Sequence, residues 1–311
     1  MNWRTVIISL FLAEFFHCSS GEVEEAEITG FDISPDDTEI IFSFSEGGKA
    51  LLYSINSEGG IAKQIFVNEE NISRINPRFS PDGQKILFLK YKNGDFSKTT
   101  LCISKPDGSK IESHTEKSGI ITEAIFSING RDIIFCKAMT YVQGSPIVMK
   151  RPHDFDLYSL DWFNGNVVKL SNVGAYGIHD VSEVDSSFVI FRLDEGPKDG
   201  LYAFDKKAPL VLKKIVPANN PRGDEGMYYD PVYDSRSNTL LFTAPYELYR
   251  MNLEDKLAQR IYDSRGTSNI SSVRLFKKSP RILFAKQGEN KMLYSINLDG
   301  TDLKQIVIKF E

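Results

Sequence analysis

Side chains able to do chemistry are few in this sequence. Beyond the apolar N-terminal run, the only histidines are His114, His153 and His179, and their spacing matches no H-x-H or H-E-x-x-H metal motif. The sequence also contains no G-x-S-x-G nucleophile motif, no phosphate-binding glycine loop and no dinucleotide fingerprint. The carboxylates of Glu123 and Asp230 remain, at similar places in a repeated pattern. What they could do depends on the elements that position them.

A strand–turn–strand pattern recurs six times along the chain. Each copy ends on a phenylalanine, and the closing rings are Phe42, Phe88, Phe135, Phe191, Phe242 and Phe284. A second motif follows each copy and contains Leu-Tyr in five of the six cases, as in "LLYSIN" from Leu51. A lone hairpin is only marginally stable, whereas small sheets stacked around an axis bury both of their faces. The sequence therefore predicts an all-β protein, a single six-bladed β-propeller of four-stranded antiparallel blades.

The repeats "FSPDGQKILF" and "DLYSLD" resemble those of the TolB-like propeller family, over roughly residues 28 to 309. This resemblance implies an exported six-bladed propeller used mainly for protein contacts in the cell envelope. The same propeller fold occurs in serine peptidases and in lyases acting on oligogalacturonate. Because the nucleophile and histidine motifs of those enzymes are missing here, we expect a non-catalytic protein. A carbohydrate-active or small-ligand-binding propeller is the alternative.

The N-terminus predicts export. Residues 1 to 18 have Arg4 followed by an apolar run from Val6 to Phe16, which is typical of a secretory signal and too short to span a membrane. Two interpretations of Cys18 stay open: it carries a lipid as the first mature residue, or cleavage occurs near Ser20. Residues 19 to 27 form a short acidic leader, and residues 28 to 311 form the propeller. We expect a periplasmic or lipid-anchored monomer in a bacterial envelope.

The two remaining cysteines, Cys102 and Cys136, lie in apolar strand-like runs. A free cysteine in such a run commonly packs as a small hydrophobic residue, although an exported protein could also form a disulfide. We favour two buried thiols.

The net charge of -5 and the pI near 5.6 argue against a nucleic-acid partner, because no basic stripe is present. Long loops instead predict a protein or peptide partner on the loop face of blades three to five. The longest cover residues 137 to 156 and 216 to 230. Tyrosine and arginine are common interface anchors, and the candidates here are Tyr141, Arg151, His153, Tyr176, Arg222, Tyr228 and Tyr229. Simple tolerance of loop insertions is the alternative.

A ring of polar residues is predicted at one mouth of the central channel. Counting back twelve residues from each closing phenylalanine gives Gly30, Asn76, Glu123, His179, Asp230 and Ser272, and the weak fourth repeat also admits Asp180. Converging carboxylates raise one another's pKa, which favours a bound calcium ion or a cationic side chain of a partner. The alternative is that Asn and Asp here cap turns. We expect no other cofactor.

Overall fold

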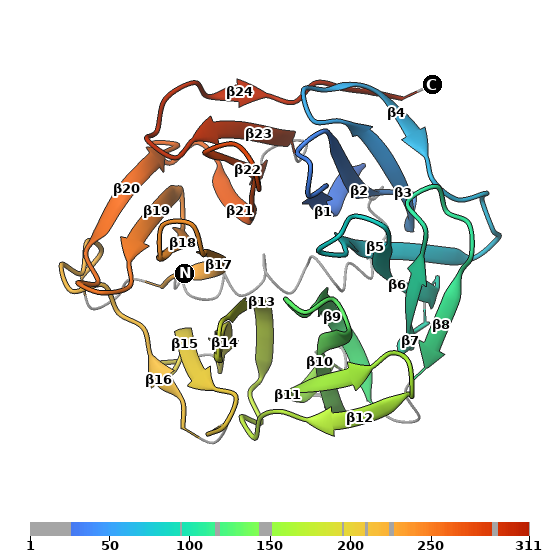
Figure 1. The fold of residues 1–311 in the computed structure, drawn as a ribbon, viewed down its shortest axis with the longest axis horizontal. Helices are drawn as coiled ribbons and strands as arrows, with labels where there is room; N and C mark the ends of the chain where they lie inside the picture. Colours follow the sequence, from blue (N-terminus) through green and yellow to red (C-terminus); the bar gives the residue numbers. More distant parts are fainter. Residues whose placement is uncertain are drawn as a thin grey trace.

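The computed structural model describes residues 26–93, 95–115, 119–142, 151–194, 196–208, 211–223, 227–287 and 292–310. All regular secondary structure of these residues is β-strand, arranged as six sheets around a central axis (Figure 1). This confirms the predicted six-bladed β-propeller. The N-terminal segment with Arg4, Cys18 and Ser20 lies outside the described residues.

The blades follow one another along the chain, and each is built from consecutive strands. The strands of blades one to three are β1 (Glu27–Ile33), β2 (Glu39–Glu46), β3 (Lys49–Asn56), β4 (Gly60–Gln64), β5 (Ile72–Phe79), β6 (Ile86–Lys92), β7 (Asp95–Ser104), β8 (Glu112–Thr115), β9 (Ile120–Phe126), β10 (Asp132–Val142), β11 (Arg151–Asp161) and β12 (Asn166–Lys169). The strands of blades four to six are β13 (Gly177–Val184), β14 (Ser187–Leu193), β15 (Gly200–Asp205), β16 (Lys213–Lys214), β17 (Tyr229–Asp234), β18 (Thr239–Ala244), β19 (Glu247–Asn252), β20 (Ala258–Asp263), β21 (Asn269–Leu275), β22 (Arg281–Gln287), β23 (Met292–Asn297) and β24 (Lys304–Gln305).

The two repeated sequence motifs meet as cross-strand pairs in the core. In blade one the closing ring of Phe42 lies opposite Tyr53 of the Leu-Tyr motif, with ring centroids 5.6 Å apart. Blades three, five and six repeat this pair as Phe135–Tyr158, Phe242–Tyr249 and Phe284–Tyr294. Aromatic pairs of this kind stabilise a sheet beyond the area that they bury. The two motifs therefore recur together because each supplies half of one contact.

In blades one and two, the turn that joins the first strand to the second is stabilised by hydrogen bonds between its own side chains. Ser34 Oγ donates to Asp36 Oδ1 at 2.6 Å in blade one, and Ser80 Oγ donates to Asp82 Oδ1 at the same distance in blade two. Gly83 has a φ of 72°, which costs glycine little. The carboxylates of Asp36 and Asp82 thus cap their turns.

The ring closes between blades six and one. A C-terminal strand, β25 (Ile308–Phe310), pairs in parallel with β4 at the outer edge of blade one (Figure 1). Between the turn after β1 and the turn after β21, the Asp37 carboxylate accepts hydrogen bonds from the backbone N–H groups of residues 277 to 279 at 2.6 to 2.9 Å. Blades one and six also share an apolar core that contains Phe31 and Leu293. Strand addition, a carboxylate cap and apolar packing together close the seam.

Cys102 and Cys136 are both buried and free. Burial raises the pKa of Cys102 to about 11 and raises that of Cys136 well above its ordinary value. Both thiols therefore stay protonated and pack as small apolar groups.

Candidate binding face and channel

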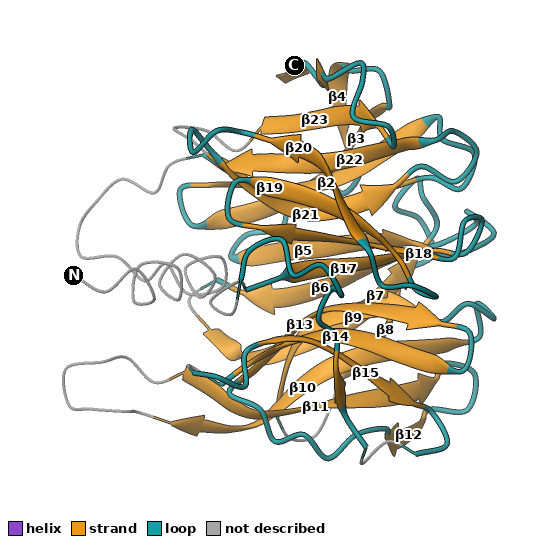
Figure 2. Cartoon of the chain, turned by 90° about the vertical axis from the view of Figure 1, so that its left-hand side faces the viewer, coloured by secondary structure: helices purple, strands orange, loops and turns teal. Residues whose placement is uncertain are grey.

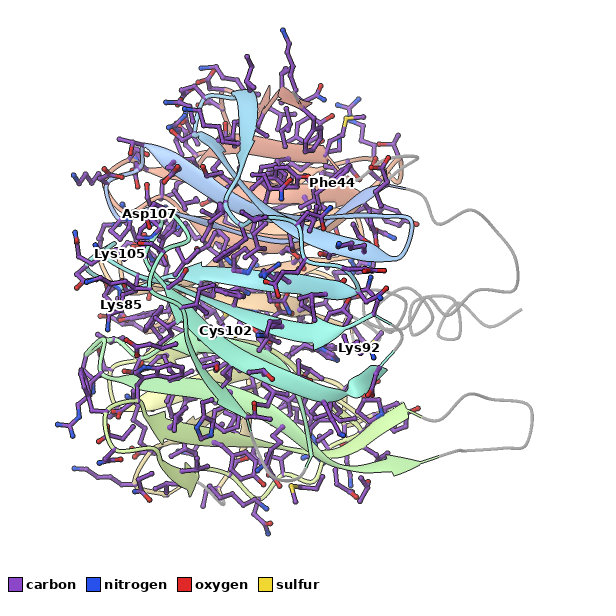
Figure 3. The ribbon with its side chains drawn as sticks, turned by 90° about the vertical axis from the view of Figure 1, so that its right-hand side faces the viewer. Phe44, Lys85, Lys92, Cys102, Lys105 and Asp107 are labelled. Atoms are coloured by element: carbon purple, nitrogen blue, oxygen red, sulfur yellow. The ribbon has the colours of Figure 1, made fainter. Side chains whose placement is uncertain are left out.

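The two ends of the propeller differ. One end, here called the turn face, carries the turns between strands one and two and between strands three and four. The other end, here called the loop face, carries the hairpins between strands two and three and the connections between blades. In blade two, Lys85, Lys105 and Asp107 lie at the turn face, Lys92 lies near the loop face, and Cys102 lies between them (Figure 3).

Blade three presents the longest hairpin of the described strands at the loop face. β10 and β11 have eleven residues each, and their pairing continues to Val142 opposite Arg151. The described part of the inner strand β9 pairs with β10 as far as Ala138, and the β10–β11 hairpin continues beyond it (Figure 2). Met139 and Thr140 are exposed on this extension. Cross-strand pairing thus gives a rigid support to side chains above the loop face.

Two of the predicted interface residues meet at the foot of this hairpin. The rings of His153 and Tyr176 pack edge to face, with centroids 4.9 Å apart, and both side chains are half-buried. Asp154 follows His153 and accepts a hydrogen bond from Thr140 Oγ1 at 2.7 Å. This bond and that with His153 lower the pKa of Asp154, so its carboxylate is ionised at neutral pH. Tyr141 and Arg151 belong to the same hairpin by their backbone pairing, and their side chains lie outside the described residues.

The prediction that Tyr228 and Tyr229 project from the rim is wrong. Both are buried, at 4% and 2% exposed. Tyr228 packs on Phe242, and Tyr229 packs on Phe191 of the neighbouring blade. Burial accordingly raises the pKa of both phenols. β17 begins at Tyr229, so these rings enter the core between blades four and five instead of ending the loop.

Arg222 lies on the loop face of blade five, but its charge is already paired. Its guanidinium forms an ion pair with Glu247, which also binds Arg260 Nη1 at 2.9 Å. Glu247 is buried, so the pair fixes the position of Arg222. The structure therefore brings His153 and Tyr176 together in blades three and four and leaves Arg222 in a separate ion-pair network.

The predicted channel ring coincides with a β-bulge in the inner strand of every blade. The ladder between strands one and two shifts at this position in all six sheets. Four ring residues have left-handed φ angles, namely Asn76 at 52°, Asp180 at 53°, Asp230 at 49° and Ser272 at 56°. Asn and Asp adopt such angles more easily than most residues. Backbone geometry at the bulge thus accounts for most of the ring.

The ring position in blade four is Asp180 and not His179. Ile190, which lies opposite Tyr202, is the counterpart of the closing phenylalanine in this blade. Asp180 lies ten residues before Ile190 instead of twelve, because two residues separate β13 from β14 where four separate β17 from β18. In blade one, a Cβ on Gly30 would lie only 2.7 Å from Asn76 Oδ1, so glycine permits a close approach between neighbouring blades.

A cation for the carboxylates comes from the chain itself. Arg78 is buried and its Nη2 lies 3.8 Å from Glu123 Oε1, while Glu123 Oε2 accepts a hydrogen bond from the Asp180 backbone at 2.6 Å. Burial, then the charge of Asp180, raises the pKa of Glu123, and Arg78 opposes this shift. Burial lowers the pKa of Arg78 to about 10, so it stays charged at neutral pH.

Arg78 and Arg274 were not among the site residues predicted from the sequence. Both follow the ring position by two residues, in blades two and six, and Arg274 influences the pKa of both Arg78 and Glu123. Extending the same alignment by two residues would have found them. The alignment does not show that Arg78 contacts both neighbouring blades. Its guanidinium pairs with Glu123 of blade three, and its Nη1 donates to the carbonyl of Phe31 of blade one at 3.1 Å.

A metal centre finds no support among the residues that the structure describes. No group of three or more His, Cys, Asp or Glu side chains in those ranges is arranged to hold a metal ion. Binding of calcium at the channel mouth stays a prediction. The described part of the chain also contains no helix long and apolar enough to cross a membrane.

Comparison with known proteins identifies the fold. No family model and no curated protein matches the sequence. Among solved structures, TolB from Acinetobacter baumannii matches with a TM-score of 0.64 and 12% sequence identity, over 97% of this chain and 68% of TolB. The chain has a TolB-like propeller fold.

Two enzymes share this TolB-like propeller at lower similarity. An oligogalacturonate lyase solved in complex with manganese has a TM-score of 0.60 and 9% identity, over 89% of this chain and 76% of the lyase. A prolyl endopeptidase has a TM-score of 0.55 and 12% identity, over 90% of this chain. The present chain spans about half of that peptidase's length, 49%. At these identities the likeness concerns the fold alone.

Proposed function

We propose that this chain is an exported, non-catalytic binding protein of the cell envelope that engages a protein or peptide through its loop face. The observation that carries the proposal is the β10–β11 hairpin, which continues beyond the described part of β9 and has the His153–Tyr176 pair at its foot. The binding face of this proposal lies on blades three and four. Tyr228 and Tyr229 no longer belong to it, because they are buried.

The chemistry of this face suits a macromolecular partner. Interface anchors are commonly aromatic residues supported by a rigid scaffold, and edge-to-face packing on His153 holds the Tyr176 ring in place. Exposed Met139 adds an adaptable apolar contact next to the ionised Asp154. The similarity to TolB supports the proposal only through the fold that the two proteins share. Under this proposal the membrane is reached only through a lipid on Cys18.

Replacement of both His153 and Tyr176 by alanine is expected to weaken partner binding at least about tenfold, because buried aromatic anchors contribute roughly 2 kcal/mol or more. The measurement is a quantitative pull-down from an envelope fraction, with mass spectrometry of the retained proteins. Phe163→Ala is the matched control, since Phe163 is an exposed ring on a strand three to strand four turn of the same blade. Full retention of every partner by the double variant would contradict the proposal.

A further inference from the structure

A buried arginine between blades one and two has an incomplete set of partners. Arg74 of β5 is 2% exposed, and its guanidinium packs on the Phe66 ring, with 4.8 Å between the guanidinium carbon and the ring centroid. Its Nη2 forms an ion pair with Glu69, but its Nε and Nη1 are buried and bond to no described residue. A guanidinium can bind one carboxylate through two parallel hydrogen bonds. Glu69 bonds to Nη2 alone, so it uses only part of this capacity.

The carboxylate on Arg74 comes from an exposed segment. Glu69 belongs to the connection between β4 and β5, its side chain is 54% exposed, and no other carboxylate of the described residues pairs with Arg74. Lys49 holds the backbone of this connection, because its ammonium donates to the Asn68 side chain and to the Glu69 carbonyl. The Glu69 side chain can therefore leave Arg74 while its backbone stays in place. Its carboxylate is already largely in water, so little hydration has to change when it leaves.

A second cation lies beside Arg74. Lys90 is its cross-strand partner on β6, so the two side chains leave the same face of blade two, with Cβ atoms about 5 Å apart. Lys90 is half-buried, and its ammonium pairs with no carboxylate of the described residues. Burial is the main cause that raises the pKa of the Cys102 thiol; Lys90 and Arg74 oppose it and Glu69 adds to it, so the three charges surround one thiol. Glu70 is exposed and forms no ion pair with a described residue. Two cations thus share one carboxylate.

We propose that Arg74 and Lys90 form a carboxylate-binding site near the loop face, which Glu69 occupies in the free protein. The ligand carries two carboxylates, as a small dicarboxylic acid or a pair of acidic side chains in a peptide does. One carboxylate replaces Glu69 on Arg74, and because no backbone tethers it, it can form both parallel hydrogen bonds. The other pairs with Lys90. This inference goes beyond the proposed function, because the site lies in blades one and two.

Glu69 is an internal competitor in this site, so removal of its charge should strengthen binding. Glu69→Gln keeps the shape of the side chain. We expect glutarate to bind this variant at least about fivefold more tightly than the wild type, in calorimetric titrations of the mature chain at pH 7 and low salt. Glutarate should also raise the melting temperature of Glu69→Gln more than that of the wild type, because it replaces the lost counter-ion of Arg74. Equal affinities of the two proteins for glutarate would overturn the proposal.

Lys90→Met tests the second cation and leaves the buried Arg74 in place. We expect it to bind glutarate about fivefold or more weakly than the wild type. Lys105→Met is the matched control, because Lys105 is an exposed cation at the turn face of the same blade (Figure 3), and it should bind within about twofold of the wild type. Equal losses for the two variants would mean that glutarate responds only to the overall charge of the chain, which contradicts the site.

The Arg74 Nε–H resonance locates the ligand. It should shift saturably as glutarate is added to the wild type, and an unchanged resonance at saturation would place the ligand elsewhere and overturn the assignment. A blocked Glu-Gly-Glu peptide separates the two sources of carboxylates: tighter binding than glutarate by about tenfold identifies a peptide, and weaker binding identifies a small acid. Tighter binding of inorganic phosphate than of both would contradict a carboxylate site. All these titrations use the purified chain, so their failure leaves the loop-face proposal on blades three and four to its own pull-down.

Discussion

Replacement of Phe42 by alanine is expected to lower the free energy of unfolding by about 4 kcal/mol. Phe42 is fully buried, stacks on Tyr53 and lies 6.3 Å from the Phe310 ring of the C-terminal strand. It also belongs to the apolar core that blades one and six share, which contains Leu293. Its loss leaves a cavity at the seam where the ring closes. Urea unfolding monitored by circular dichroism measures the change.

Phe163→Ala is the control for this prediction, because it removes the same ring from an exposed position. Phe163 is 75% exposed, and Lys85 lies 5.9 Å from its ring centroid. An exposed contact of that kind contributes less than about 1 kcal/mol. Similar losses for the two variants would contradict the assignment of the closing phenylalanines to the core.

Replacement of Arg78 by methionine is expected to cost about 3 kcal/mol at pH 7. The guanidinium is buried beside Glu123 and donates to the Phe31 carbonyl, so its removal leaves an uncompensated carboxylate in the channel. Without Arg78 the already raised pKa of Glu123 rises further, since Arg78 is the strongest influence that lowers it. Thermal or urea unfolding across a pH series measures the effect.

The pH dependence of this loss has a definite sign. A carboxyl group whose folded-state pKa is raised binds more protons in the folded than in the unfolded state between the two pKa values. Its destabilising effect is thus complete above the folded pKa and disappears as the pH falls toward the unfolded pKa. The cost of Arg78→Met should shrink on acidification, and Glu123→Gln in the same chain should recover much of it at pH 7. A loss that is independent of pH and not rescued would contradict the ion pair.

The architecture was predictable because its determinants are local and repeated. A closing phenylalanine and a Leu-Tyr motif recur at blade-length intervals, and each contributes to the same cross-strand pair, as Phe42 and Tyr53 do. The register failed only in blade four, where Ile190 replaces the phenylalanine opposite Tyr202. The turn between β13 and β14 is also two residues shorter than that between β17 and β18, so counting back twelve residues from Phe191 missed Asp180 by one.

The candidate sites were less predictable because they depend on contacts between blades. Tyr228 and Tyr229 have the composition of an interface loop, and only the start of β17 shows that they enter the core. The role of Arg78 depends on Glu123, which lies a whole repeat away in the sequence. Likewise, the extension of the β10–β11 hairpin beyond the described part of β9 depends on the relative lengths of these strands, and strand ends are hard to place from sequence.

The measurement that tests binding at the loop face most directly is site-specific photocrosslinking in intact cells, followed by mass spectrometry. A photoreactive phenylalanine analogue replaces Tyr176 beside His153 or, in a parallel strain, Phe163 on the exposed turn of blade three. We predict a covalent adduct with an envelope protein from position 176 and none from position 163. An adduct from position 163 together with none from position 176 would contradict the account, because the partner would then bind at the turn of blade three and not at the loop face.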